Sequence, residues 1–140
     1  MRFVGSLLSV VAALTAVGSF FLGAMRIFTD DPHNPVVAWG YALIACAILM
    51  ILLGVMAAAL LWIKPWFAEK AMWLGAVAGI VAMGVEGVVV FIARNYPNAP
   101  DAQTAITSVL LSGAVPAVAA GSAALLTRYL VLPNIGARPA

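Results

Sequence analysis

Four long apolar segments, separated by short stretches that hold most of the charges, leave this chain few ways to fold. They cover residues 3–25, 36–63, 71–93 and 105–127, and each can cross a hydrocarbon core of about 30 Å, which takes about 20 helical residues. Backbone polar groups in lipid must be satisfied within the segment, so each span is expected to be helical. We therefore predict an all-α integral membrane protein of four transmembrane helices with short loops. Residues 1–140 would form one domain that ends in a short tail, 128–140.

The composition agrees with this prediction. Hydrophobic residues make up 65% of the chain and charged residues 9%, whereas a soluble domain carries charge at about 25% of its positions. The first segment is long for the apolar part of a signal peptide, and Gly23-Ala24-Met25 is a poor cleavage site. We therefore expect this segment to be a retained helix.

The basic residues predict the orientation of the chain, because Lys and Arg are enriched in cytoplasmic loops. Arg26 and Arg94 would lie on one side, and the other five basic residues would lie on the opposite side with both termini. That excess places both termini and the middle loop in the cytoplasm. Arg outnumbers Lys and Ala, Val and Gly are abundant, which suggests a bacterial gene and hence the bacterial inner membrane. The five residues assigned to the cytoplasmic side are Arg2, Lys64, Lys70, Arg128 and Arg138.

Tryptophans cluster around the expected inner loop, residues 64–70. Indole rings prefer the headgroup level of a bilayer, so they are expected to act as interfacial anchors. The alternative is a shared aromatic site for a ligand. The anchors are Trp62, Trp66 and Trp73 near the inner loop, and Trp39 near the outer end of the second span.

Glu86 is the only ionisable residue deep inside any of the four segments, where a lone charge costs several kcal/mol. The same segment contains Gly75-Ala-Val-Ala-Gly79, a small-residue pair that lets another helix approach closely. Glu86 lies eleven positions after Gly75, which returns it to within about 20° of the same helical line. Ala82 lies near this line too. Gly75, Gly79, Ala82 and Glu86 are thus predicted to form a face for helix packing or partner binding.

Hydroxyl groups of other spans are expected at the depth of Glu86, about 10 Å below the outer end of its helix. With two arginines at that end, they would form a polar seam between spans one, three and four. The seam could fix helix register, carry a proton or cation, or dock a basic residue of a partner. Its candidate members are Ser19, Ser108, Ser112, Arg26 and Arg94.

Sites for enzyme chemistry are not apparent in the sequence, and we expect no enzyme, cofactor or metal. Cys46 is the single cysteine, and His33 is the single histidine. Asp30, Asp31 and His33 could bind a metal weakly, but a solvated turn explains them as well.

The sequence therefore favours a non-catalytic membrane protein. The first hypothesis is a subunit or assembly factor of a larger bacterial membrane complex, for example a respiratory or photosynthetic one. Its partners would be the lipid bilayer and other transmembrane subunits or further copies of itself, without nucleic acid. The second hypothesis is a small oligomeric transporter or channel that uses Glu86 as its coupling group. A membrane-disrupting protein is a third.

Overall fold

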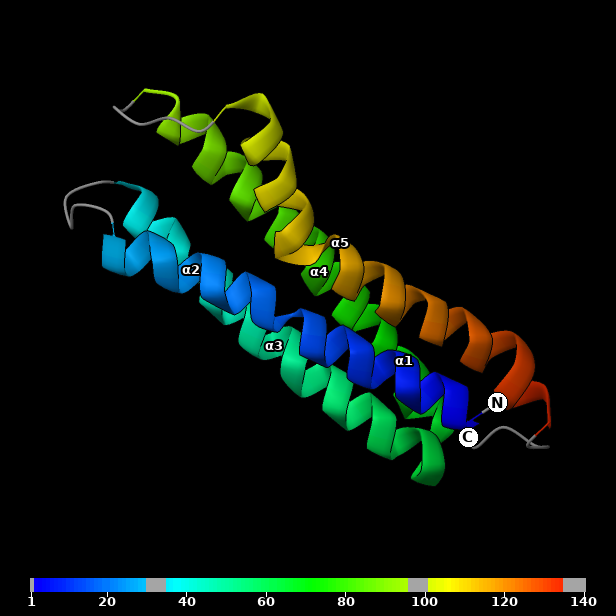
Figure 1. Ribbon diagram of the computed structural model, residues 1–140. Coiled ribbons are helices and arrows are strands. Elements are labelled where there is room, and N and C mark those ends of the chain that lie inside the picture. The colour runs from blue at the N-terminus through cyan, green and yellow to red at the C-terminus, as the bar shows by residue number, and fades with distance from the viewer. Residues whose placement is uncertain (1, 30–34, 96–100, 135–140) are drawn as a thin grey trace.

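The computed structural model describes residues 2–29, 35–95 and 101–134, and these ranges form helices with no strand. Within them four helical rods are long and apolar enough to cross a membrane, which confirms an all-helical chain with four candidate spans (Figure 1). Asp30, Asp31, His33 and Arg138 lie outside the described residues. The helices are α1 (Arg2–Thr15), α2 (Val17–Thr29), α3 (Pro35–Ile63), α4 (Pro65–Ala93) and α5 (Ala102–Leu126), followed by the π-helix η1 (Thr127–Val131) and the 3₁₀-helix η2 (Leu132–Asn134).

The first rod consists of α1 and α2, which meet at Ala16. The Thr15 hydroxyl donates to the carbonyls of Val11 and Ala12, at 2.8 and 3.1 Å. Back-bonding of this kind bends helices. The backbone bonds from Ala16 to Ala12 and from Phe20 to Ala16 persist, so α1 and α2 continue each other as one bent rod.

The turn between α3 and α4 is much shorter than predicted. The expected inner loop 64–70 is wrong, because α4 begins at Pro65 and only Lys64 separates the two helices. Proline suits the first turn of a helix, since its missing N–H would have no intrahelical partner there. The carbonyl of Lys64 accepts from the amides of Phe67 and Ala68. The third span therefore starts six residues earlier than predicted.

The last rod is also longer than predicted. Asp101 caps α5 by accepting from the Thr104 amide at 2.8 Å, so the helix starts before residue 105. At its other end the chain continues helically through η1, so residues 128–134 are not an unstructured tail. Pro116 lies inside α5, and the ribbon changes direction near the middle of this helix (Figure 1).

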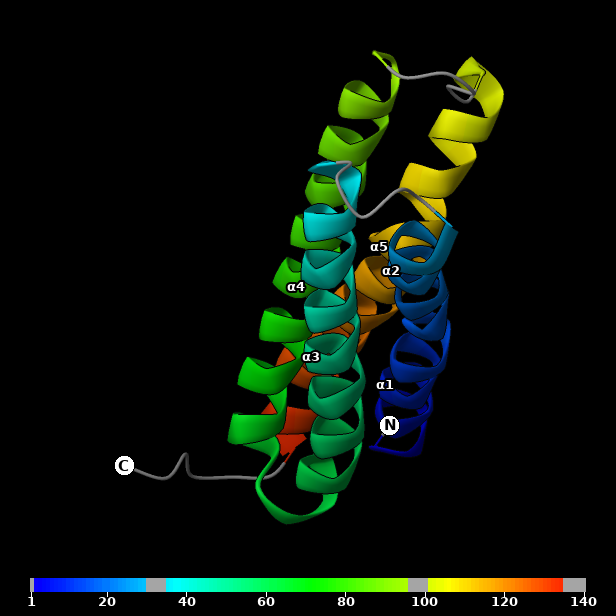
Figure 2. The same cartoon turned by 90° about the vertical axis from the view of Figure 1, so that its left-hand side faces the viewer.

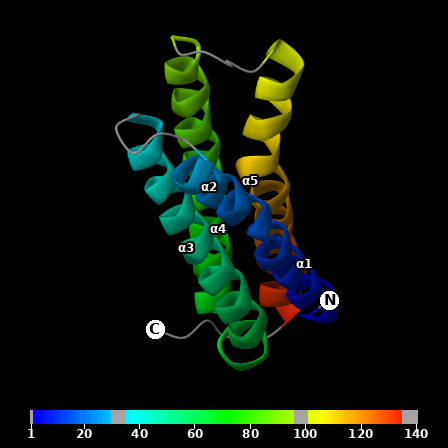
Figure 3. The same ribbon diagram turned by 60° about the vertical axis from the view of Figure 1, so that its left-hand side comes forward.

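The rods form a closed ring in which α1–α2 packs between α3 and α5, and α4 packs between the same two helices (Figure 3). Glycines allow the closest approaches. A Cβ on Gly113 of α5 would overlap the carbonyl oxygen of Gly79 of α4, and one on Gly54 would lie 2.8 Å from the Ser9 carbonyl oxygen. The interior is correspondingly built mainly from alanines and other small side chains.

The two ends of the bundle differ. Three segments lie together at one end of the bundle: the start of α1, the α3–α4 turn and η1 (Figure 2). We call it the basic end, because Arg2, Lys64, Lys70 and Arg128 belong to these segments or lie close to them in the chain. At the opposite end the ribbons of α4 and α5 diverge from those of α2 and α3 (Figure 1).

Candidate functional site

Glu86 lies on the inward face of α4, together with the small residues that the helical geometry assigns to that face. Its exposed fraction is 0%, and Gly75, Gly79 and Ala82 are also buried. Gly79 contacts Gly113 and Ala117 of α5, and Gly75 lies near Ala120. The small-residue face is therefore occupied by a helix of the same chain.

The carboxylate of Glu86 forms an ion pair with Arg26 of α2. Arg26 Nη2 donates to Glu86 Oε1 at 2.8 Å, a distance typical of a charge-assisted hydrogen bond. The side chain of Arg26 is 22% exposed, whereas that of Glu86 is fully covered. The pair joins α2 to α4, which are not neighbours around the ring. It thus ties the two diverging halves of the bundle together across the interior.

Local packing of α2 against α3 brings Arg26 to this position. Gly23 and Gly40 approach so closely that a Cβ on Gly23 would lie 2.7 Å from the Gly40 carbonyl oxygen. A Cβ on Gly40 would in turn lie 2.9 Å from the Cβ of Arg26. Any larger residue at position 40 would therefore displace the arginine. Arg26 also lies in the last turn of α2, where the helix dipole favours a cation.

Two atoms of the pair remain without a hydrogen-bond partner in the described parts of the chain, Glu86 Oε2 and Arg26 Nε. Each is buried. The ion pair is therefore incompletely satisfied, and a buried polar atom without a partner carries a desolvation cost of about 1–3 kcal/mol. A small polar ligand or water could satisfy either atom.

The predicted polar seam forms only in part. Arg26 reaches Glu86, but Arg94 is exposed and takes no part in the pair. The Ser19 hydroxyl donates to the Leu43 carbonyl of α3 at 3.5 Å, not toward α4. Ser108 and Ser112 donate to carbonyls of their own helix, at 2.9 and 2.6 Å. These hydroxyls therefore support packing and local geometry instead of continuing the site.

A second buried acid is Glu69, which lies in the segment that the sequence predicts to be a loop. Glu69 is 9% exposed and lies in the second turn of α4. The Trp73 indole N–H donates to its Oε1 at 3.4 Å, and Arg128 Nη1 of η1 lies 3.7 Å from the same oxygen. Pro65 is the signal that could have revealed it, because a helix starting there places Glu69 and Trp73 one turn apart.

The four predicted anchor tryptophans divide between the two ends of the bundle. Trp39, Trp62 and Trp73 are 37%, 55% and 38% exposed. Trp62 also donates its indole N–H to the Ser6 hydroxyl at 2.9 Å, which links α3 to α1. Trp66 is half-buried and lies on α4, not in a loop.

The groups of this site offer charge, hydrogen bonding and proton exchange. Among residues 2–29, 35–95 and 101–134, no group of three or more His, Cys, Asp or Glu side chains is placed to hold a metal ion. The ion pair can lock helices together or exchange a proton or small ion. Comparison of the chain with protein-family models, with curated proteins and with solved structures found no match.

Proposed function

We propose that this chain is a four-span protein of the bacterial inner membrane, with both termini cytoplasmic, that acts without catalysis as a subunit or assembly factor of a larger membrane complex. Its task is to bind another transmembrane protein through the outer surface of α4. The bundle itself serves as a rigid support that presents this surface.

The observation that carries the proposal concerns Gly84 and Gly87 of α4, which have open space where a side chain would lie. Among the described residues, no atom beyond the neighbouring backbone of α4 lies within 4 Å of the position that a Cβ would take at Gly84 or Gly87. Glycine inside a helix costs about 1 kcal/mol relative to alanine, and the glycines between helices offset this cost by close packing. Gly84 and Gly87 gain no such close packing from the residues that the structure describes. A partner helix lying against them would supply it.

The surface beside these glycines has a shape that suits a helix. Gly87 and Val90 of α4 and Ile106 and Leu110 of α5 border an apolar groove of about 270 Å³. Large side chains of a partner helix can enter such a groove, while the glycines allow its backbone to come close.

An interior cavity in the described part of the bundle is too small for a transported molecule larger than water. A cavity bordered by Ser9, Met50, Gly75 and Pro116 has a volume of about 10 Å³. This is about the space that one water molecule needs. A closely packed centre supports a structural role more than a transport route.

Copurification from native membranes in mild detergent tests the proposal. We expect a defined partner to remain bound to the wild-type chain and to be lost with Gly84→Phe and Gly87→Phe. Ala59→Phe is the matched control, because Ala59 lies exposed on α3. If the partner is a second copy, differently tagged chains will copurify with the same dependence. A wild-type monomer without a partner, or equal binding by all three variants, would overturn the proposal.

The second candidate is a small oligomeric transporter or channel, and the unsatisfied Oε2 of Glu86 favours it. A proton or small cation could occupy that oxygen while Arg26 holds the other. Purified protein in liposomes would then conduct protons or a cation, and Glu86→Gln would abolish the flux. Absence of flux in the wild type would exclude this candidate.

A further inference from the structure

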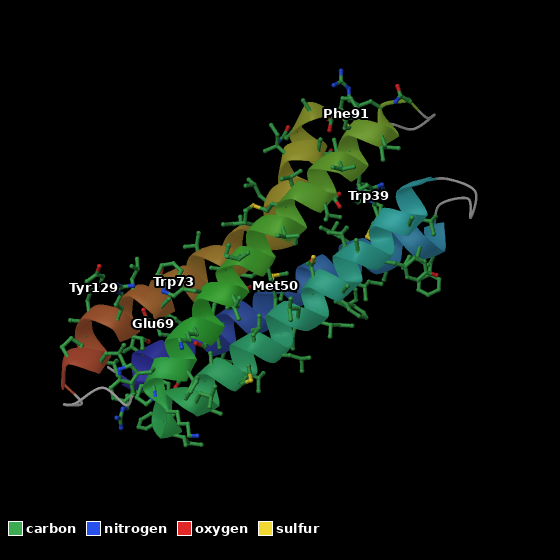
Figure 4. The ribbon with its side chains drawn as sticks, turned by 180° about the vertical axis from the view of Figure 1, so that it is seen from behind. Trp39, Met50, Glu69, Trp73, Phe91 and Tyr129 are labelled. Carbon is green, nitrogen blue, oxygen red and sulfur yellow. The ribbon has the colours of Figure 1, made fainter. Side chains whose placement is uncertain are left out.

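A further groove lies at the basic end of the bundle, far along α4 from the ion pair. It is a surface groove of about 510 Å³ between the start of α4 and the η1–η2 segment. Figure 4 shows Glu69 and Trp73 on α4 where it runs beside the last turns of the chain. The side chains that line the groove and bear on its chemistry are Trp66, Glu69, Lys70, Trp73, Arg128 and Leu132.

The charges of the groove sum to one positive unit, from Lys70 and Arg128 against Glu69. Arg128 is 59% exposed, and its Nη1 lies 3.7 Å from Glu69 Oε1, which is too long for a hydrogen bond. The carboxylate therefore attracts the guanidinium by charge without accepting a hydrogen bond from this nitrogen. The N–H donors of Arg128, which lines the groove, are therefore not used by Glu69.

The groove is lined by two indole rings and by an arginine from the π-helical turn η1. Trp66 and Trp73 line it, and the indole N–H of Trp73 donates to Glu69. Arg128 lies in the π-helical turn η1, where the residues are phased differently from those of the preceding α5. Such turns within helices occur frequently at functional sites, because they redirect one side chain.

We propose that this groove binds a phosphate group, supplied by the headgroup of an anionic phospholipid. Arginine matches the geometry of phosphate oxygens with two parallel N–H donors, and Lys70 adds a second cation. Indole rings favour the depth of lipid headgroups, and basic pockets between helices on the cytoplasmic side bind anionic headgroups. The lipid source rests on the membrane placement proposed above, whereas the phosphate chemistry rests on the groove alone.

Thermal stability and native mass spectrometry of the purified chain in detergent test this proposal. The added ligands are phosphatidylglycerol, phosphatidylcholine and inorganic phosphate, each titrated separately. The variants are Lys70→Gln and Arg128→Gln, and Arg2→Gln is the charge-matched control at the same end. We expect phosphatidylglycerol to bind and stabilise the wild type. Loss of one cation should weaken that binding about fivefold, the effect of about one surface charge on an anionic lipid.

The three ligands separate the sources of the phosphate. If phosphatidylglycerol is the one ligand of the three that binds, and both groove variants but not Arg2→Gln weaken its binding, the lipid headgroup is the source of the phosphate. Binding of inorganic phosphate with the same dependence supports a phosphate site whose ligand is soluble. Absence of binding, equal binding of phosphatidylcholine, or equal weakening by Arg2→Gln overturns the proposal. Because the purified chain is used alone, failure here leaves the partner experiment on Gly84 untouched.

Discussion

The Arg26–Glu86 pair gives the sharpest prediction of stability. Two unit charges about 4 Å apart attract by about 4 kcal/mol at an effective dielectric constant of about 20. Arg26→Gln would leave a fully covered carboxylate without its cation, and we expect a loss of about 3–5 kcal/mol in the free energy of unfolding. Glu86→Gln should cost less, about 1–2 kcal/mol, because Arg26 is partly exposed and can turn toward water.

The double variant Arg26→Gln/Glu86→Gln completes the cycle. It removes both charges, so it should be more stable than Arg26→Gln alone, with a coupling of about 2–3 kcal/mol. Unfolding by SDS in mixed micelles, followed by tryptophan fluorescence, measures each variant. Arg94→Gln is the control, since its exposed side chain should contribute within about 0.5 kcal/mol. Equal and additive losses for the two single variants would show that the ion pair does not couple the helices.

Two further predictions concern helix packing and helix capping. Gly113→Ala should lower the free energy of unfolding by about 1–3 kcal/mol, because the new methyl group would overlap the backbone of Gly79. Gly121→Ala is the control: no described residue packs within 4 Å of its Cβ position, so the change should be neutral or stabilising by up to about 1 kcal/mol. SDS titration compares these two, and a stable Gly113→Ala would refute the close contact. The hydrogen bonds from Thr104 lower the pKa of Asp101 below its ordinary value of 3.8. The capping hydrogen bond therefore contributes its full stabilisation above pH 3.8, and this stabilisation is lost as the pH falls through the lowered pKa of Asp101. The Thr104 amide signal in NMR should accordingly titrate below pH 3.8. Asp101→Asn should abolish that titration, and a midpoint above 3.8 would contradict the cap.

The sequence predicted the rods well because apolar length alone decides whether a segment can span a bilayer. The inward direction of Glu86 followed from helical periodicity, which needs no knowledge of neighbouring helices. The boundaries were less accurate. Lys64–Lys70 contains two lysines and a proline, which resemble a loop, yet Pro65 is a favoured first helical residue and α4 starts there.

The partners of Glu86 could not be predicted because they depend on how the rods are arranged. Arg26 and Arg94 stand in similar sequence contexts, at the ends of two spans. The close contact of Gly23 with Gly40 helps to bring Arg26 to Glu86, whereas Arg94 is exposed. Similarly, Ser19 faces α3, where its hydroxyl donates to the Leu43 carbonyl.

The single-residue turn at Lys64 has a mechanical consequence. It joins the two halves of the bundle at the basic end with no slack, so the halves cannot slide past each other there. Any relative movement of the halves must therefore be a rotation about the basic end. The displacement would be largest at the opposite end, where the Arg26–Glu86 ion pair joins α2 to α4. The Arg26–Glu86 pair therefore lies where it opposes such a rotation most effectively, as a rigid bundle requires.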